Sequence, residues 1–292
     1  MAAAEPLVGL NVGYFLSPRT HVMMTAYGAT TRWLVAGVRL DYQEIARKPF
    51  GGPFGAVGLA AAHGFGRQDL FVEVARSFDR QAGGGGGLAF VTRSTTSVGD
   101  GELELSLRAY GPKFTNPYAR PISAPDELDG LRARDEAGAR VRLTQRPHPK
   151  IAVRALLDGW RRFVVPSLSA FASARVDAQL SSAWLASVWA EFRSAGRRTL
   201  VAARVAFTAL RELTLSLQAH HRWHGSSGRQ RDVSGVLALT GRPVERLGIR
   251  VRFRYDIEDL FDNHRLPHTA WLYVECAFRL RERDVLRVRY DL

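Results

Sequence analysis

The segment Leu247-Gly-Ile-Arg-Val-Arg-Phe-Arg-Tyr-Asp-Ile257 decides the fold class of this 292-residue chain. Its odd-numbered positions carry Leu, Ile, Val, Phe, Tyr and Ile, whereas the even-numbered positions carry Gly, three Arg and Asp. A β-strand sends successive side chains to opposite faces, and helical spacing would mix the two sets. The segment therefore predicts a strand with one apolar and one charged face.

The same alternation recurs along most of the chain, and we find no segment of helical period with caps. An α/β fold with crossover helices is therefore disfavoured. No run of about 18 apolar residues exists, so a transmembrane helix is excluded. The predicted strands are 7–15, 20–28, 31–43, 54–65, 68–79, 87–95, 101–110, 136–146, 149–160, 168–180, 183–194, 198–209, 213–223, 232–241, 246–257, 268–280 and 284–292.

Many predicted strands are joined by very short turns, which makes consecutive strands antiparallel neighbours. Longer connections fall on alternate links, at 47–53, 79–87, 111–135, 161–167, 224–231 and 258–267. Long loops at one end and tight turns at the other are typical of outer-membrane barrels. We therefore predict an all-β, antiparallel, up-and-down transmembrane β-barrel of about sixteen strands, forming a single domain over 1–292.

The count of seventeen predicted strands is odd, whereas bacterial single-chain barrels have an even number of strands. We attribute the difference to a miscount around 168–194, or to a strand missing together with an upstream region. The start, Met1 to Pro6, lacks a secretory signal, which an outer-membrane protein needs. Either the signal was removed, or the chain is part of a longer protein with an upstream signal and periplasmic domain.

A soluble β-sandwich would show the same alternation, because its apolar face points into a core. Unbroken hairpin succession, the length of the chain and aromatic residues near strand ends favour the membrane barrel, where aromatics form interfacial girdles. These aromatic residues are Tyr14, Phe15, Trp33, Tyr42, Phe78, Tyr110, Trp160, Trp223 and Tyr290.

The formal charge of +13 comes almost entirely from arginines spread along the chain, with only three lysines. If the apolar face meets lipid, the arginines line a lumen. Two interpretations stay open: a satisfied lattice of interstrand ion pairs, or an excess-positive pore that favours small anions. The predicted lumen-lining residues are Arg250, Arg252, Arg254, Arg287, Arg289 and Glu275.

The segment 111–135 is rich in proline, which bars a regular strand or helix and predicts a long ordered loop. Such a loop can fold into a lumen as a constriction or plug. The predicted constriction residues are Phe114, Asn116, Tyr118 and Arg120.

Three motifs resemble the barrel portion of bacterial outer-membrane proteins whose upstream part is a helix-hairpin-helix domain similar to competence DNA-uptake proteins. They are Phe114-x-Asn-Pro-Tyr-Ala119, Asp135-Glu-x-Gly138 and Arg154-x-x-x-Asp158-x-Trp160. The resemblance is most specific over 101–160. It implies an outer-membrane location and a link to DNA or envelope transport, with nucleic acid bound only through an upstream domain. No helix-hairpin-helix segment is visible in this chain.

Nothing in the sequence indicates an enzyme, a cofactor or a metal site. There is no Gly-x-Ser-x-Gly motif, and no serine is tied to a particular histidine. His220 and His221 would point to opposite faces of a strand, and Cys276 is the single cysteine. The predicted function is a passive or plugged outer-membrane channel. The alternatives are a non-conducting membrane anchor or interaction scaffold for DNA uptake or envelope transport, and a soluble β-rich binding module.

Overall fold

The structure of the chain is a computed structural model. It describes residues 3–4, 6–33, 52–79, 85–116, 118, 122, 134–194, 197–210, 213–224, 230–258, 268–280 and 285–292. Within this part of the chain, no helix is long and apolar enough to span a bilayer.

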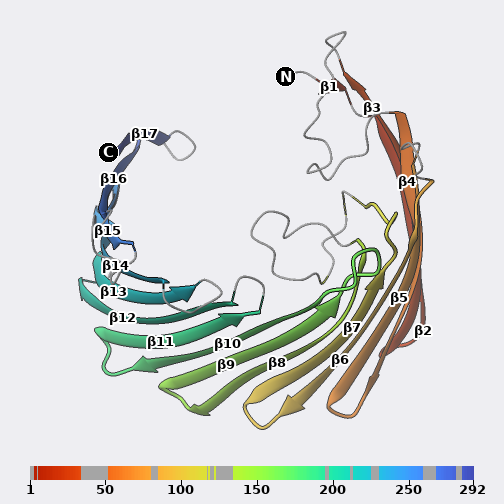
Figure 1. Cartoon of the computed structure of the whole chain (residues 1–292), viewed down its shortest axis with the longest axis horizontal. Coiled ribbons are helices and arrows are strands. Elements are labelled where there is room, and N and C mark those ends of the chain that lie inside the picture. The colour runs from red at the N-terminus through yellow and green to blue at the C-terminus, as the bar shows by residue number, and fades with distance from the viewer. Residues whose placement is uncertain are drawn as a thin grey trace. The chain divides into compact units, whose positions relative to one another are not determined.

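Sixteen long strands, β2 to β17, account for almost all of the described residues and follow one another as hairpins (Figure 1). A two-residue strand, β1 (Ala3–Ala4), pairs with β3. The long strands are β2 (Leu7–Ser17), β3 (Thr20–Trp33), β4 (Gly52–Phe65), β5 (Gln68–Phe78), β6 (Leu88–Val98), β7 (Gly101–Tyr110), β8 (Glu136–His148), β9 (Ile151–Arg161), β10 (Leu168–Gln179), β11 (Trp184–Arg193), β12 (Arg198–Leu210), β13 (Leu213–His224), β14 (Gln230–Val244), β15 (Leu247–Ile257), β16 (His268–Arg279) and β17 (Val285–Asp291).

The strands form one sheet in which sequence neighbours lie side by side, and the predicted all-β, up-and-down antiparallel fold of about sixteen strands is confirmed. The separate strand predicted at 31–43 is wrong at its start, because residues 31–33 continue β3. Residues 34–43 lie outside the described residues. The segments around 168–194 form two strands, β10 and β11, as predicted, so the seventeenth predicted strand does not arise from this region.

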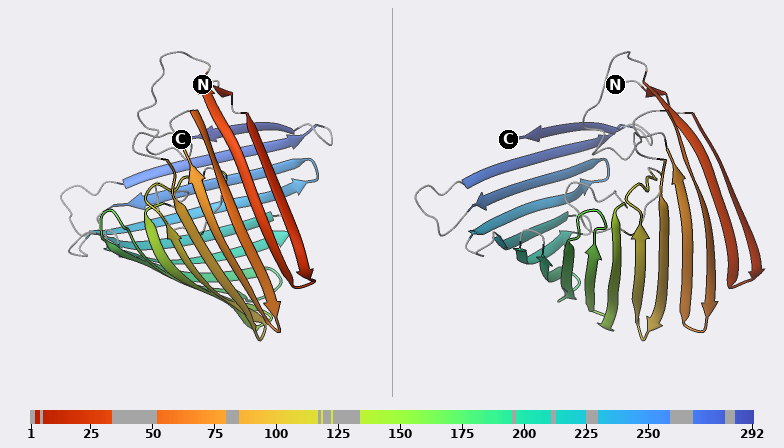
Figure 2. Two further views of the ribbon diagram at one scale, coloured as in Figure 1. Left: turned by 90° about the vertical axis from the view of Figure 1, so that its right-hand side faces the viewer. Right: turned by 45° about the vertical axis from the view of Figure 1, so that its right-hand side comes forward.

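Tight turns and longer connections alternate along the chain, as the sequence predicts. Residues 66–67 join β4 to β5, and residues 99–100 join β6 to β7. Gly66 and Gly99 both adopt a φ of 57°, which favours glycine because a Cβ would be strained there. Adjacent strands consequently run antiparallel through short reversals, as the ribbon views show (Figure 2).

Burial on the two faces of the sheet is the reverse of that in a soluble sandwich. In β7, Leu103, Leu105 and Leu107 are exposed, whereas Glu104, Ser106 and Arg108, which alternate with them, are buried. In β13, Leu217 is 62% exposed while Ser216 beside it is 8% exposed. An exposed apolar face over many strands needs a nonaqueous partner, and a lipid bilayer supplies one.

The aromatic girdle predicted at the strand ends holds only for some of its members. Tyr14, Phe78 and Tyr290 are exposed at strand ends. Tyr110 is 1% exposed and stacks on Phe114, so its assignment to a girdle is wrong. The reason is strand parity, since Tyr110 shares the polar face with Arg108. Tyr42 lies outside the described residues.

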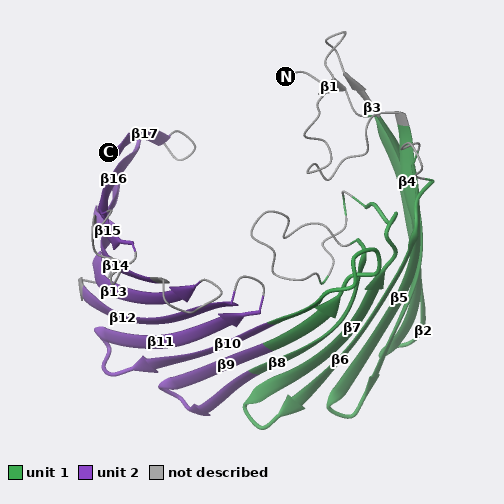
Figure 3. Ribbon diagram, in the orientation of Figure 1, with its two compact units in different colours: residues 1–143, 157–170 green, residues 144–156, 171–292 purple. Residues whose placement is uncertain are grey.

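The chain divides into two compact units, coloured separately in Figure 3. Unit 1 consists of residues 1–143 and 157–170, and unit 2 of residues 144–156 and 171–292. Each unit is described below by itself.

Candidate functional site: the polar face of the sheet

The polar face of unit 1 contains a buried network of four charged residues. The Arg108 guanidinium donates to Glu136 Oε1 through Nε at 2.5 Å and to Asp158 Oδ1 through Nη1 at 2.8 Å. Arg140 donates to the other Asp158 oxygen at 2.7 Å. Arg108 and Asp158 side chains are both fully inaccessible to solvent. In this region the arginines form a paired lattice, in which charge is compensated locally.

A glycine makes room for this network. A Cβ built on Gly138 would lie 2.8 Å from Arg108 Cζ and 2.8 Å from the carbonyl oxygen of Gly159. Both approaches are closer than real Cβ atoms allow, so the guanidinium can occupy its position only because residue 138 has no side chain. Arg108 Nη2 is buried without a hydrogen-bond partner in the described part of the chain. The site is therefore tightly packed but not completely satisfied.

Unit 2 has a smaller cluster of the same kind around Asp177. Arg154 and Arg175 both donate to its carboxylate, at 2.7 and 2.8 Å. The Ser187 hydroxyl donates to Asp177 Oδ1 at 2.6 Å. Two arginines on one carboxylate leave this cluster with a net positive charge.

The predicted lumen-lining arginines lie together on the polar face of β15, β16 and β17 in unit 2. In the register of the three strands, Arg250 lies opposite Glu275, which in turn lies opposite Arg289. Arg254 and Arg289 each pair with an acidic residue two positions along the same strand, Asp256 and Asp291. Their side chains remain 41% and 62% exposed.

We call the five arginines of this region the open arginine row; they are Arg250, Arg252, Arg254, Arg287 and Arg289. Three carboxylates share the same polar face, those of Asp256, Glu275 and Asp291. Within the described residues, Arg250, Arg252 and Arg287 have no carboxylate oxygen within 4 Å. The row therefore carries more positive charge than its neighbours neutralise.

The start of the long loop after β7 lies on the polar face of unit 1. Phe114 is 4% exposed and packs with Tyr110 over Ala75 and Ala89. The Ser77 hydroxyl oxygen accepts hydrogen bonds from the backbone N–H groups of Thr115 and Gly87, at 3.0 and 3.1 Å. The loop is thus fixed to β5 by a buried serine.

Two further predicted loop residues make contacts with β3. The Tyr27 hydroxyl donates to Asn116 Oδ1 at 2.9 Å, and the Tyr118 ring meets the Tyr27 ring edge-on at 5.1 Å. Tyr118 also stacks on Phe54 at 6.2 Å. Arg120 lies outside the described residues. The structure therefore brings three of the four predicted constriction residues together, on the polar face of β3 to β7.

These contacts border a partly open cavity of about 380 Å³ in unit 1, which we call the aromatic cavity. Rings line much of it, and two charged residues, Glu73 and Arg93, complete it. Its lining is Thr25, Tyr27, Phe71, Glu73, Ala75, Ala89, Val91, Arg93, Tyr110, Phe114, Asn116, Tyr118 and Ile122. A volume of this size falls in the lower range of small-molecule sites.

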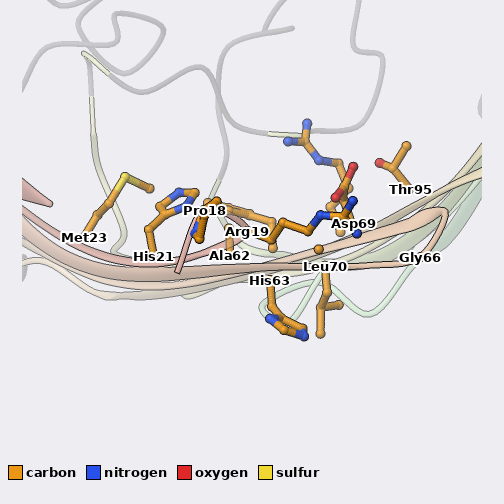
Figure 4. Close-up of a pocket in the computed structure, with 13 residues that line it drawn as sticks. Pro18, Arg19, His21, Met23, Ala62, His63, Gly66, Asp69, Leu70 and Thr95 are labelled. Carbon is orange, nitrogen blue, oxygen red and sulfur yellow. The ribbon is translucent and has the colours of Figure 1, made fainter. Parts of the chain in front are cut away.

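A second, more open cavity of about 700 Å³ lies near the tight turns of unit 1 (Figure 4). Arg19, His21, Met23 and Asp69 point to one side of the ribbon, whereas His63 points to the other. The opposite direction of His63 follows from its parity in β4, since its neighbours on that face are Ala61 and Leu59. The lining is mixed and lacks a cluster of convergent donors.

The histidines predicted to lie apart do so. His220 contacts Trp189 edge-on at 5.8 Å, whereas His221 stacks on Trp223 at 4.1 Å on the opposite face. In the described part of the chain, no three His, Cys, Asp or Glu side chains gather as metal donors. Cys276 is exposed on the apolar face, in register with Ile249 and Val288.

The sequence predicts Asp158 as an opposite-sign partner for arginines on neighbouring strands, but it does not predict that Arg108 is the arginine it pairs with, or that Glu136 shares that arginine. Arg108 and Glu136 lie 28 positions apart, and nothing local links them. Glu73 and Tyr27 were likewise not singled out. Strand alternation is the one sequence feature that could have indicated Glu73 and Tyr27, because it places both side chains on the polar face that the loop residues contact.

The long hairpin succession, the exposed apolar face and the charged opposite face define the fold of an outer-membrane β-barrel. Among solved structures, the chain is similar to the crystal structure of the siderophore receptor PirA from Acinetobacter baumannii, with a TM-score of 0.55 and 8% sequence identity. The match covers 99% of this chain and 60% of that receptor chain. At this identity the likeness shows the fold alone.

No family model and no curated protein matches the sequence. The resemblance to barrels associated with helix-hairpin-helix domains therefore stays a prediction. The chain spans about 60% of the length of the receptor it matches.

Proposed function

We propose that this protein is an outer-membrane channel whose polar face conducts small anions past the open arginine row. The observation that carries the proposal is the charge on β15 to β17, where five arginines share a face with three carboxylates and stay accessible to solvent. Rings of arginine or lysine favour anions in pores. The likeness to a siderophore receptor supports the barrel fold on which the proposal rests.

The exposed apolar face supports the location. Charged side chains on a lipid-facing surface are costly, whereas charged side chains on the opposite face of the same strand tune selectivity. In β15 the apolar positions Val251, Phe253 and Tyr255 alternate with Arg250, Arg252 and Arg254. The strand thus separates a lipid-facing side from a water-facing side without any change of backbone.

The test is conductance of the refolded protein in a planar bilayer under a tenfold KCl gradient. We expect discrete current steps and a reversal potential that is shifted from zero towards the chloride equilibrium potential. Replacing Arg250, Arg252 and Arg287 by Gln should move the reversal potential towards zero, because three positive charges are lost from a row in which five arginines face three carboxylates.

A matched control replaces three arginines near the tight turns of the same unit, Arg242, Arg246 and Arg279, by Gln. This triple variant loses the same charge and should change the reversal potential much less. Insertion without conductance would overturn the channel proposal and favour a non-conducting scaffold. Equal shifts in the two triple variants would show that net charge, rather than the open arginine row, sets selectivity.

A further inference from the structure

The aromatic cavity of unit 1 has a chemistry different from that of the open arginine row. Five rings line it, from Tyr27 on β3, Phe71 on β5, Tyr110 on β7, and Phe114 and Tyr118 on the following loop. The floor is made of small residues, Ala75 and Ala89, over which Tyr110 and Phe114 pack. Aromatic faces carry negative charge density and attract cations at close range.

A carboxylate completes this environment. Glu73 lines the cavity from the middle of β5, half-buried, with Val91 as its partner in the register. Within the described residues, the Glu73 carboxylate makes no hydrogen bond or ion pair, unlike Glu104, Glu136 and Asp158 of the same face. A partly desolvated carboxylate without a partner is stabilised when a cation approaches.

The neighbouring cation is already engaged elsewhere in the cavity wall. Arg93 lies opposite Phe71 in the register, and its guanidinium sits over the Phe71 ring with Cζ 5.8 Å from the centroid. Arg93 makes no ion pair with Glu73, which lies two positions along β5 from Phe71 and so shares its face. Arg93 is therefore a positive charge that a cationic ligand must tolerate and an anionic ligand would exploit.

The rings are held in place before any ligand arrives. Tyr27 donates to Asn116 at 2.9 Å, Tyr110 donates to the carbonyl oxygen of Ile122 at 2.9 Å, and Phe114 stacks on Tyr110 at 5.9 Å. Preorganised rings lower the entropic cost of binding. From the rings, the unpaired carboxylate and the volume together, we infer that this cavity binds a small organic cation with an aromatic or alkylammonium group.

The experiment measures binding of phenyltrimethylammonium to the full chain in phosphatidylcholine nanodiscs by isothermal titration calorimetry, with empty nanodiscs subtracted. Benzenesulfonate serves as the anionic probe of similar size. We expect saturable binding of phenyltrimethylammonium and no saturable binding of benzenesulfonate. The reverse preference would overturn the inference.

Two substitutions of opposite sign sharpen the test. Glu73→Gln keeps the size of the side chain and removes its charge, so the affinity for phenyltrimethylammonium should fall about tenfold. Arg93→Gln removes the repelling charge and should raise the affinity. Glu102→Gln is the matched control, because Glu102 is exposed on the same polar face and does not line the cavity.

Folding of each variant is checked by heat modifiability on gels. An equal loss in the Glu73→Gln and Glu102→Gln variants would contradict a local site. The outcome is independent of the proposed anion conductance, because the readout is binding rather than current and the residues lie in unit 1.

Discussion

Two arginine-bearing regions of the same sheet have opposite electrostatics. In the Arg108 network, two arginines, Arg108 and Arg140, share the two carboxylates of Glu136 and Asp158, and Arg108 is 3% exposed. In the open arginine row, the carboxylates are fewer than the arginines, and the paired members keep 41% or more of their side-chain surface. Burial thus accompanies compensation, and exposure accompanies excess charge.

The difference teaches that compensated and excess arginine charge occupy different regions of the polar face. Buried ions need partners because the loss of hydration is expensive. Exposed ions keep their water, so an imbalance costs little and remains available to attract counter-ions. The paired lattice supports the sheet, and the open arginine row is the part of the polar face on which the proposed anion conductance rests.

The largest effect should come from breaking the buried network. Arg108→Met leaves Glu136 and Asp158 buried with incomplete pairing, and should lower the free energy of unfolding by about 3–5 kcal/mol. Arg252→Met in the open arginine row should change it by less than about 0.5 kcal/mol. Urea titrations in lipid vesicles, followed by tryptophan fluorescence, measure both. Similar losses in the two variants would remove the distinction between the regions.

A smaller effect is expected from crowding the network without touching its charges. Gly138→Ala places a Cβ 2.8 Å from Arg108 Cζ and should cost about 1–3 kcal/mol of unfolding free energy. Gly159→Ala is the matched control, since a Cβ there meets nothing within 4 Å. The same urea titration applies. Equal stability of the Gly138→Ala and Gly159→Ala variants would contradict close packing of the Arg108 guanidinium against residue 138.

The smallest effect should follow removal of an exposed pair. Asp256→Asn frees Arg254, whose Nε lies 2.7 Å from the Asp256 carboxylate, and should cost at most about 1 kcal/mol. The cost should shrink further in high salt, because screening already weakens an exposed pair. Unfolding free energies at two NaCl concentrations measure this. A loss as large as that of Arg108→Met would mean that the row is as tightly coupled as the buried network.

Much of the fold was predictable because strand alternation is a local property. Segments such as Leu247–Ile257 specify their two faces within eleven residues, and short turns specify antiparallel neighbours. The predicted strand at 31–43 failed in its described part because β3 runs on to Trp33, and alternation does not mark where a long strand ends. The prediction for Tyr110 is wrong because strand parity, not nearness to the strand end, decides that its side chain lies on the polar face.

The sequence by itself determined that the chain is a two-faced antiparallel sheet and which residues belong to each face. Only the tertiary structure decided which arginines are neutralised. Arg108 and Arg252 look alike in sequence, since each stands between two apolar residues. Arg108 meets Glu136 and Asp158, which come 28 and 50 positions later, whereas Arg252 meets the Trp271 ring. Side-chain direction repeats every two residues, but cross-strand partners depend on the register between distant segments, and no local pattern encodes that register.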